Sequence, residues 1–195
     1  MMEKNPTISK KDHTDKISTG WLYTKRVIRD AFFLMGVVIL VSWGQSFKFK
    51  GKALSTAALG EMLTTVSSGS IPLSPSSQLQ LVFIFAPWCQ VCHANADIFE
   101  NFSSFGYEVK GLGVSYERAD EVGRFVQESG FKPAALIASP AIEAELEKNL
   151  AIREFPTFIV LSRNGEVLTG WTGYTTKWGL WMRMWGIRFL SSHLL

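Results

Sequence analysis

The sequence is poor in cysteine, with only Cys89 and Cys92 among 195 residues. A small fold stapled by several disulfides is therefore excluded, as is a metal or iron–sulfur site built from four cysteines. A large excess of charge is also lacking, because 20 Lys and Arg face 17 Asp and Glu, a net charge of +3. A net charge this small indicates no polybasic surface, and we expect no nucleic-acid partner.

Low hydrophobicity, which marks fully disordered chains, is absent as well: 47% of the residues are hydrophobic and 13% aromatic. The length suits one domain with a sizeable core and a short appendage. No internal repeat is visible. Only the N-terminal end, which is polar, Lys-rich and without apolar periodicity, departs from this composition, and we predict a cytoplasmic tail over residues 1–26.

One uncharged run breaks the globular pattern, the 17 residues from Ala31 to Phe47. This length is at the short end for crossing a bilayer. A cleaved signal peptide is less consistent with the long polar segment before the run, and a buried core helix is less consistent with the Lys and Arg on both sides. We predict an uncleaved transmembrane signal anchor over residues 27–47. A slight excess of basic residues on its N-terminal side indicates an N-terminus inside the cell and the remaining chain in the periplasm or outside.

The rest of the chain predicts a tether over residues 48–60 and an α/β domain over residues 61–195. A small hairpin is expected within residues 62–73. The strand and helix patterns that follow alternate, and an Asn-Gly pair at residues 164–165 marks a late hairpin turn. The expected strands are Leu79–Phe85, Glu108–Ser115, Ala135–Ala138, Thr157–Leu161 and Glu166–Trp171, and the expected helices are Cys92–Phe102, Asp120–Ser129, Ala141–Leu150 and a closing segment, Thr175–Leu190.

The two cysteines form a CxxC pair that directly follows the first buried strand. Two cysteines placed at random in such a chain fall at this spacing in about 1% of placements. A helix that starts here would offer unpaired N–H groups and the positive end of its dipole to Cys89. We therefore expect Cys89 to be the nucleophilic thiolate and Cys92, one turn further on, to be the resolving thiol of a disulfide exchange.

This combination resembles a known family. The LVFIFAPWCQVC segment, followed about sixty residues later by Phe155-Pro156-Thr157 and a hairpin, looks like a thioredoxin fold. With the VSWG end of the apolar run and the GWTGYTTKWGLWMRMWG ending, it is similar to the suppressor-for-copper-sensitivity D family. Members are TlpA-like protein disulfide oxidoreductases, anchored in the inner membrane of bacteria with the thioredoxin domain in the periplasm.

The resemblance implies the fold, the partners and the roles of several residues. It implies a thioredoxin fold preceded by one transmembrane helix, no bound cofactor, protein disulfides as substrates and a membrane thiol reductase as electron donor. Pro156 would be a cis-proline facing the CxxC pair, and Trp88, Phe155 and Thr157 would contact the substrate. The pair would act as a reductant, and the family's name suggests a link to copper tolerance.

An acidic partner for the resolving thiol is not found at the position where thioredoxin carries one. Thioredoxin keeps a buried acid in the strand that leads to its CxxC motif, but the matching residue here is Phe83. TlpA-like relatives place an acid after the neighbouring strand, which makes Glu117 the candidate for proton exchange with Cys92. The alternative is a solvated Glu that stabilises the start of a helix.

Two further functions are compatible with the cysteine pair. His93 completes a C-x-x-C-H motif, the attachment sequence of c-type haem, so an electron-transfer haem protein is one alternative. A dithiol can also bind Cu(I), although no Met-rich or His-rich cluster surrounds this pair.

The aromatic end of the chain is open to two interpretations. Trp178, Trp181 and Trp185 recur on one face of the expected closing helix. We expect this face to pack on the sheet. The alternative is a position at the membrane interface, where Trp beside Arg183 and Arg188 is favoured.

Overall fold

The computed structural model describes residues 26–34, 36–37, 44, 49, 51–67, 69–75, 79–99, 102 and 107–194. The chain divides into two units, Met1–Gly44 and Gln45–Leu195. In the first unit, residues 26–34 and 36–37 are helical and mostly exposed. The second unit contains the strands and the remaining helices.

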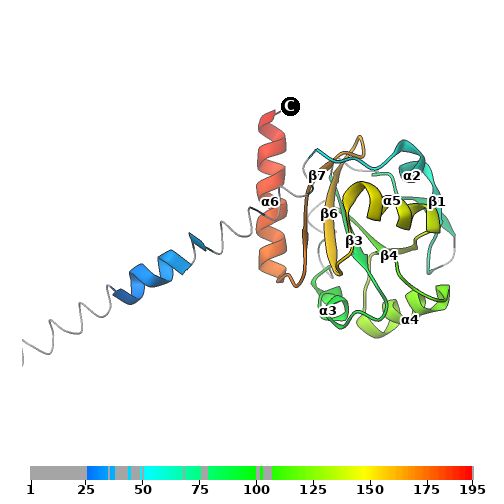
Figure 1. Cartoon of the computed structure of the whole chain (residues 1–195), viewed down its shortest axis with the longest axis horizontal. Helices are drawn as coiled ribbons and strands as arrows, with labels where there is room; N and C mark the ends of the chain where they lie inside the picture. Colours follow the sequence, from blue (N-terminus) through cyan, green and yellow to red (C-terminus); the bar gives the residue numbers. More distant parts are fainter. Residues whose placement is uncertain are drawn as a thin grey trace, which may run out of the picture. The chain divides into compact units, whose positions relative to one another are not determined.

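The second unit is an α/β fold around one mixed sheet (Figure 1). The sheet has the strand order β5-β4-β3-β6-β7, in which β3, β4 and β5 are parallel and β6 and β7 are antiparallel to their neighbours. A separate antiparallel pair, β1-β2, precedes it. The elements are α2 (Thr56–Gly60), β1 (Met62–Thr64), β2 (Ser70–Pro72), β3 (Leu79–Phe85), α3 (Gln90–His93), the 3₁₀ helix η1 (Ala96–Phe99), β4 (Glu108–Gly113), α4 (Ala119–Ser129), β5 (Ala134–Ile137), α5 (Pro140–Leu150), β6 (Thr157–Ser162), β7 (Val167–Thr172) and α6 (Lys177–Leu194).

The helices cover both faces of the sheet, so the central strand β3 is buried throughout. Along β3 the residues alternate between two cores: Phe83 and Phe85 face α3, α4 and α6, whereas Val82 and Ile84 face α2 and α5. All seven residues of this strand are buried, as the uninterrupted apolar run predicts. Phe83, at the position of thioredoxin's acid, packs among the rings of Phe85, Phe99, Phe131 and Phe158.

A glycine on β4 brings α4 close to the sheet. A Cβ atom on Gly113 would lie only 2.7 Å from Cγ1 of Val122 and 2.8 Å from its Cγ2. Only a residue without a side chain allows this approach. The helix that follows β4 is therefore held tightly behind the C-terminal ends of β3 and β4, where the cysteines lie.

Most predicted elements are present within a few residues of their expected ends, but the helix after the cysteines is wrong. It was expected over Cys92–Phe102, whereas α3 ends at His93 and a short 3₁₀ turn follows. Asn95 accounts for the break. Its buried amide donates to the Val91 carbonyl, and its Oδ1 accepts from the N–H of Thr175, each at 2.9 Å. Side-chain hydrogen bonds of this kind compete with helical ones.

The predicted tether is also wrong, because residues 51–60 belong to the folded unit. Leu54, Ala58 and Leu59 are buried in the core shared with α5, and the residues 56–60 form α2. Ala53 pairs with Glu166 beside β7. Small residues in this stretch predict a linker, but they form a capped helix, with Ser55 Oγ accepting from the Ala58 N–H at 3.1 Å.

About half of the predicted anchor, residues 27–47, lies outside the described residues. In the part of the chain that the structure describes, no helix combines the length and the hydropathy needed to cross a membrane. The anchor and the cytoplasmic tail of residues 1–26 stay predictions.

Candidate active site

Cys89 and Cys92 form a disulfide at the start of α3, with their Cα atoms 5.2 Å apart. Cys89 is the N-cap residue of the helix, and its Sγ accepts a hydrogen bond from the N–H of Cys92 at 3.2 Å. Cys92 is fully buried, whereas Cys89 keeps 6% of its surface exposed. Only Cys89 can therefore be approached from solvent, although by a smaller surface than the sequence led us to expect.

Because α3 is short, its dipole stabilises a thiolate at Cys89 less than a long helix would. Four helical residues align few peptide dipoles, so the macrodipole expected from a long helix contributes little here. A single directed N–H group takes its place. The Cys92 N–H that now donates to Cys89 Sγ is positioned to donate to a thiolate on the same atom, and such a hydrogen bond favours the charged form.

The cysteines are flanked by the loop that carries the cis-proline. The peptide bond between Phe155 and Pro156 is cis, as predicted from the resemblance. Phe155 meets the exposed indole of Trp88 edge to face, with ring centroids 6.1 Å apart. The structure thus brings together two of the three residues predicted to contact substrate. The third, Thr157, is fully buried and donates its hydroxyl to the Glu154 carbonyl at 2.6 Å, so its side chain holds the loop and has no exposed surface for a substrate.

Residues 74–180 match the family described as Thioredoxin-like domain, which is more than half of the chain. The chain belongs to the thioredoxin-like domain family. A comparison with curated protein sequences finds no significant match. With a CxxC disulfide inside the matched region, the predicted class of enzyme, a thiol–disulfide oxidoreductase, is confirmed.

Solved structures support the thioredoxin-like fold. StoA from Bacillus subtilis is 19% identical with a TM-score of 0.52, covering 63% of this chain and 96% of StoA. MTB DsbF is 16% identical with a TM-score of 0.55, covering 69% and 99%. A thiol:disulfide interchange protein of the thioredoxin family from Chlorobium tepidum is 21% identical with a TM-score of 0.53, covering 67% and 94%. At these identities the similarity concerns the fold.

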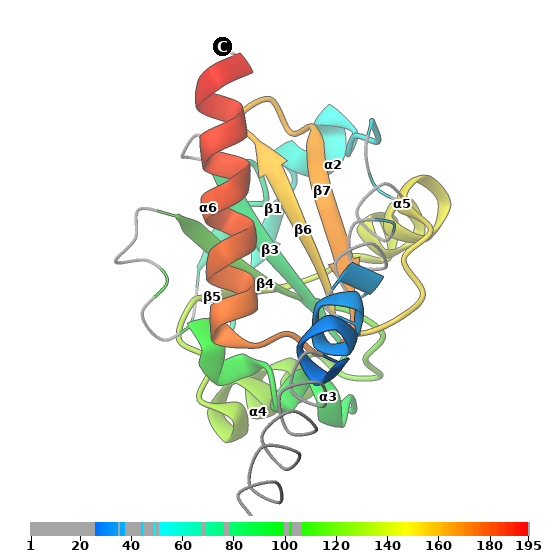
Figure 2. The same cartoon turned by 90° about the vertical axis from the view of Figure 1, so that its left-hand side faces the viewer.

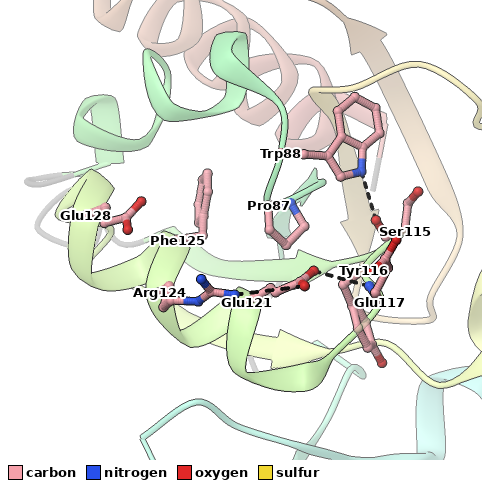
Figure 3. Close-up of a pocket in the computed structure, with 9 residues that line it drawn as sticks. All are labelled: Pro87, Trp88, Ser115, Tyr116, Glu117, Glu121, Arg124, Phe125 and Glu128. Atoms are coloured by element: carbon pink, nitrogen blue, oxygen red, sulfur yellow. Dashed lines mark hydrogen bonds and ion pairs between the residues drawn. The ribbon is translucent and has the colours of Figure 1, made fainter.

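A pocket of about 610 Å³ lies beside the CxxC loop of this thioredoxin-like domain (Figure 3). Figure 3 shows its walls: Pro87 and Trp88 on one side, the loop after β4 on another, and α4 below. The lining residues are Pro87, Trp88, Ser115, Tyr116, Glu117, Glu121, Arg124, Phe125 and Glu128. Three of the four charged side chains are carboxylates, and Arg124 lies 3.9 Å from Glu121.

Glu117 lies in this pocket and not against the resolving thiol. It is exposed, and its backbone N–H donates to the Glu121 carboxylate at 3.2 Å. Among the described residues, no hydrogen bond joins Glu117 to either cysteine. This position just before α4 agrees with the alternative of a solvated Glu near a helix start, and a catalytic role for Glu117 stays a prediction.

Ser115 and Glu143 position Trp88, although no sequence motif marks either residue. The indole N–H of Trp88 donates to the Ser115 carbonyl at 2.9 Å, and the Ser115 N–H donates to the Glu143 carboxylate at 2.8 Å. Ser115 has a φ of 53°, a left-handed conformation that is unusual for a residue other than glycine. No sequence pattern links residues 28 positions apart, so only the fold reveals this connection.

The residues around the pair do not fit a c-type haem. Attachment would bond both cysteines to the porphyrin and leave the His93 imidazole to ligate iron. Here the sulfur atoms bond each other, His93 Nε2 donates to the Pro87 carbonyl at 3.2 Å, and the ring packs on Phe125 with centroids 4.5 Å apart. In the described part of the chain, no three His, Cys, Asp or Glu side chains converge. Cu(I) binding by the reduced pair stays an untested alternative.

Proposed function

We propose that this protein is a membrane-anchored disulfide reductase of the bacterial periplasm, similar to the suppressor-for-copper-sensitivity D family. Residues 27–47 would anchor it in the inner membrane with residues 1–26 in the cytoplasm. A membrane thiol reductase would supply electrons, and disulfides of periplasmic proteins would receive them. The matches to a thiol:disulfide interchange protein and to the thioredoxin-like family support the reaction class.

The reaction proceeds by two exchanges. In the reduced protein the Cys89 thiolate attacks one sulfur of a substrate disulfide, and the second substrate sulfur leaves as a thiolate. The Cys92 thiol loses its proton and attacks Cys89 Sγ, which releases the first substrate sulfur. Two electrons have then reached the substrate, and the Cys89–Cys92 disulfide has formed. A donor dithiol then reduces the Cys89–Cys92 disulfide by the same two exchanges in reverse, and the donor becomes a disulfide.

The difference in access between the two sulfur atoms is the observation that supports these roles. Cys92 is 0% exposed and its backbone N–H points at Cys89 Sγ, whereas Cys89 caps the helix and retains some exposed surface. A partner disulfide can reach only Cys89. Trp88 and Phe155, in edge-to-face contact beside it, offer an apolar surface to the partner chain.

Trapping of mixed disulfides tests these roles. Cys92→Ser should accumulate covalent complexes with a protein substrate, because Cys89 still attacks and nothing releases it. Cys89→Ser, the matched control, should accumulate none. Non-reducing gel electrophoresis with a defined disulfide protein measures the difference. Equal trapping by the two variants would contradict the assignment without affecting the fold.

The direction of electron transfer requires a separate measurement. We expect equilibration with glutathione buffers to give a potential closer to that of thioredoxin, about −270 mV, than to that of the oxidant DsbA, about −120 mV. A value near the DsbA end would mean that the pair oxidises its partners.

The membrane location is tested by flotation of the full chain with lipid vesicles and by protease accessibility of the domain in intact spheroplasts.

A further inference from the structure

Helix α6 carries an aromatic row on its outer face. Leu180 and Met184 point inward and are fully buried, but the face that bears the tryptophans is exposed. The expectation that these rings pack on the sheet is therefore wrong. The exposed fractions are 75% for Trp178, 36% for Trp181, 64% for Met182, 58% for Trp185 and 55% for Phe189. Figure 2 shows α6 lying across one face of the sheet.

These five side chains, called the aromatic row below, form one stripe. At about 100° per residue they fall within an arc of about 100° around the helix. Trp178 meets Trp181 edge to face at 6.1 Å, and Trp185 stacks with Phe189 at 5.9 Å. Single exposed apolar residues are ordinary, but a continuous stripe of large ones marks a surface that binds something.

The charges of α6 favour an anionic lipid surface as the occupant. The helix contains no Asp or Glu, and its cations are Lys177, Arg183 and Arg188. Lys177 and Arg188 are exposed and lie along one border of the aromatic row, about 70–90° of helix rotation from its centre. Trp with flanking Lys and Arg is the composition of helices that lie in the headgroup region. A second copy of α6 would oppose cation to cation and is disfavoured.

The path of the chain adds a geometric argument, which rests on the proposed anchor. Phe49 is buried against β7, where a Cβ atom on Gly170 would lie 2.8 Å from its ring. The next residue of β7, Trp171, faces the other side of the sheet, where the Arg183 guanidinium of α6 lies 4.8 Å from its ring centroid. The predicted span ends at residue 47, so only Lys48, about 7 Å of chain, would separate the span from Phe49. With the predicted anchor in the membrane, so short a connection would keep the domain close to the bilayer surface.

We propose that the aromatic row of α6 lies in the headgroup region of an anionic bilayer and holds the thioredoxin-like domain on the membrane surface. The domain would then present its CxxC loop at a set height above the lipid. A donor dithiol embedded in the same membrane would meet the pair without searching the bulk solution.

Quenching of Trp fluorescence by brominated lipids in the full chain tests this proposal. Trp21, Trp43 and Trp88 are changed to Phe, which leaves the buried Trp171 as a reference and the three tryptophans of the aromatic row as reporters. The protein is reconstituted in vesicles of phosphatidylcholine and phosphatidylglycerol, with bromine high on the acyl chains. We expect quenching that disappears when Trp178, Trp181 and Trp185 are also changed to Phe, and that weakens without phosphatidylglycerol.

Flotation of the same samples separates this proposal from the anchor. A chain that floats with the vesicles but shows no quenching overturns the membrane contact of α6 and leaves the anchor standing. A chain that does not float overturns both, because the aromatic row itself should bind these vesicles. Cross-linking between copies through α6, in place of quenching, would identify a second copy as the occupant. Since Trp88 and the tryptophans of the row are exposed, the changes at these positions should not unfold the domain, which circular dichroism verifies.

Discussion

Ser115 holds the Trp88 indole beside the disulfide, and its own backbone adopts an unfavourable left-handed conformation there. A left-handed φ costs a residue other than glycine about 1–2 kcal/mol. The hydrogen bond from its N–H to Glu143 offsets part of this cost, and the carbonyl on its other side accepts from Trp88. Glu143, at the first turn of α5, thereby helps to position an indole next to the cysteine pair.

Substitution of Glu143 tests this connection. Glu143→Ala should lower the free energy of unfolding by about 1 kcal/mol, because it removes a partly exposed acceptor from the Ser115 N–H. Glu143→Gln keeps an oxygen at that place and should retain most of the stability. Urea unfolding compares the two. Equal stability of the Ala and Gln variants would show that the hydrogen bond contributes nothing.

The Tyr116 hydroxyl gives a prediction about pH. Burial, and secondarily the Glu143 charge, raise the pKa of Tyr116 above its ordinary value of 10.0. The folded state thus holds this proton more tightly than the unfolded state, so stability should fall as the pH rises above about 10, where the unfolded tyrosine ionises. Glu143→Gln removes the secondary cause and should make the fall smaller. Thermal unfolding between pH 9 and pH 11 measures it, and an unchanged slope in the variant would contradict the Glu143 contribution.

At the scale of elements, α6 combines a packed inner face with an exposed outer one. Its inner residues join the core around Phe158 and Trp171. Asn95 fastens its beginning to the CxxC loop through the Thr175 N–H. The helix can therefore rest on a second surface without losing its place on the sheet.

Alanine substitutions on the two faces should separate these contributions. Leu180→Ala and Met184→Ala each create a cavity in the core and should cost about 2–5 kcal/mol. Trp178→Ala changes a side chain that is 75% exposed and should stay within about 0.5 kcal/mol. Denaturant unfolding in the absence of lipid compares them. A large loss for Trp178→Ala would show that this ring packs on the domain.

At the scale of the whole molecule, the folded unit extends beyond the boundary that composition indicates. The predicted domain starts at residue 61, but Phe49, Leu54 and Leu59 before it fill the core between the sheet and α5. This segment also reaches the late hairpin, since the side chain of Leu59 packs directly on Gly165 and leaves no room for a Cβ atom there.

Two N-terminal truncations test this boundary. A fragment that begins at Gln45 should fold, whereas one that begins at Glu61 loses three large buried side chains, each contributing about 1.5–3 kcal/mol. The sum is comparable to the whole stability of a typical domain, about 5–15 kcal/mol, so the shorter fragment should be largely unfolded. Circular dichroism with thermal melts distinguishes them. Equal melting temperatures would restore residues 48–60 as a tether.

The sequence by itself determined the elements whose cause is local. An apolar run covered on both faces predicts β3, Asn164-Gly165 predicts the turn between β6 and β7, and the CxxC spacing after a buried strand predicts the reactive pair. The prediction of a cis peptide bond before Pro156 rests on the resemblance to a known family. These features depend on neighbours along the chain, or on motifs that carry their own context.

Only the tertiary structure decided the features that depend on distant partners. Asn95 ends the helix after the cysteines because the Thr175 N–H, 80 positions away, needs its side chain. Glu143 reaches Ser115 because α5 begins beside the loop after β4. The aromatic row is exposed because Leu180 and Met184 already fill the contact with the sheet. Periodicity shows that a helix has an apolar face. Where a helix has two apolar faces, the one that is buried is the one whose side chains fit the space left by the sheet, and only the packed structure shows which that is.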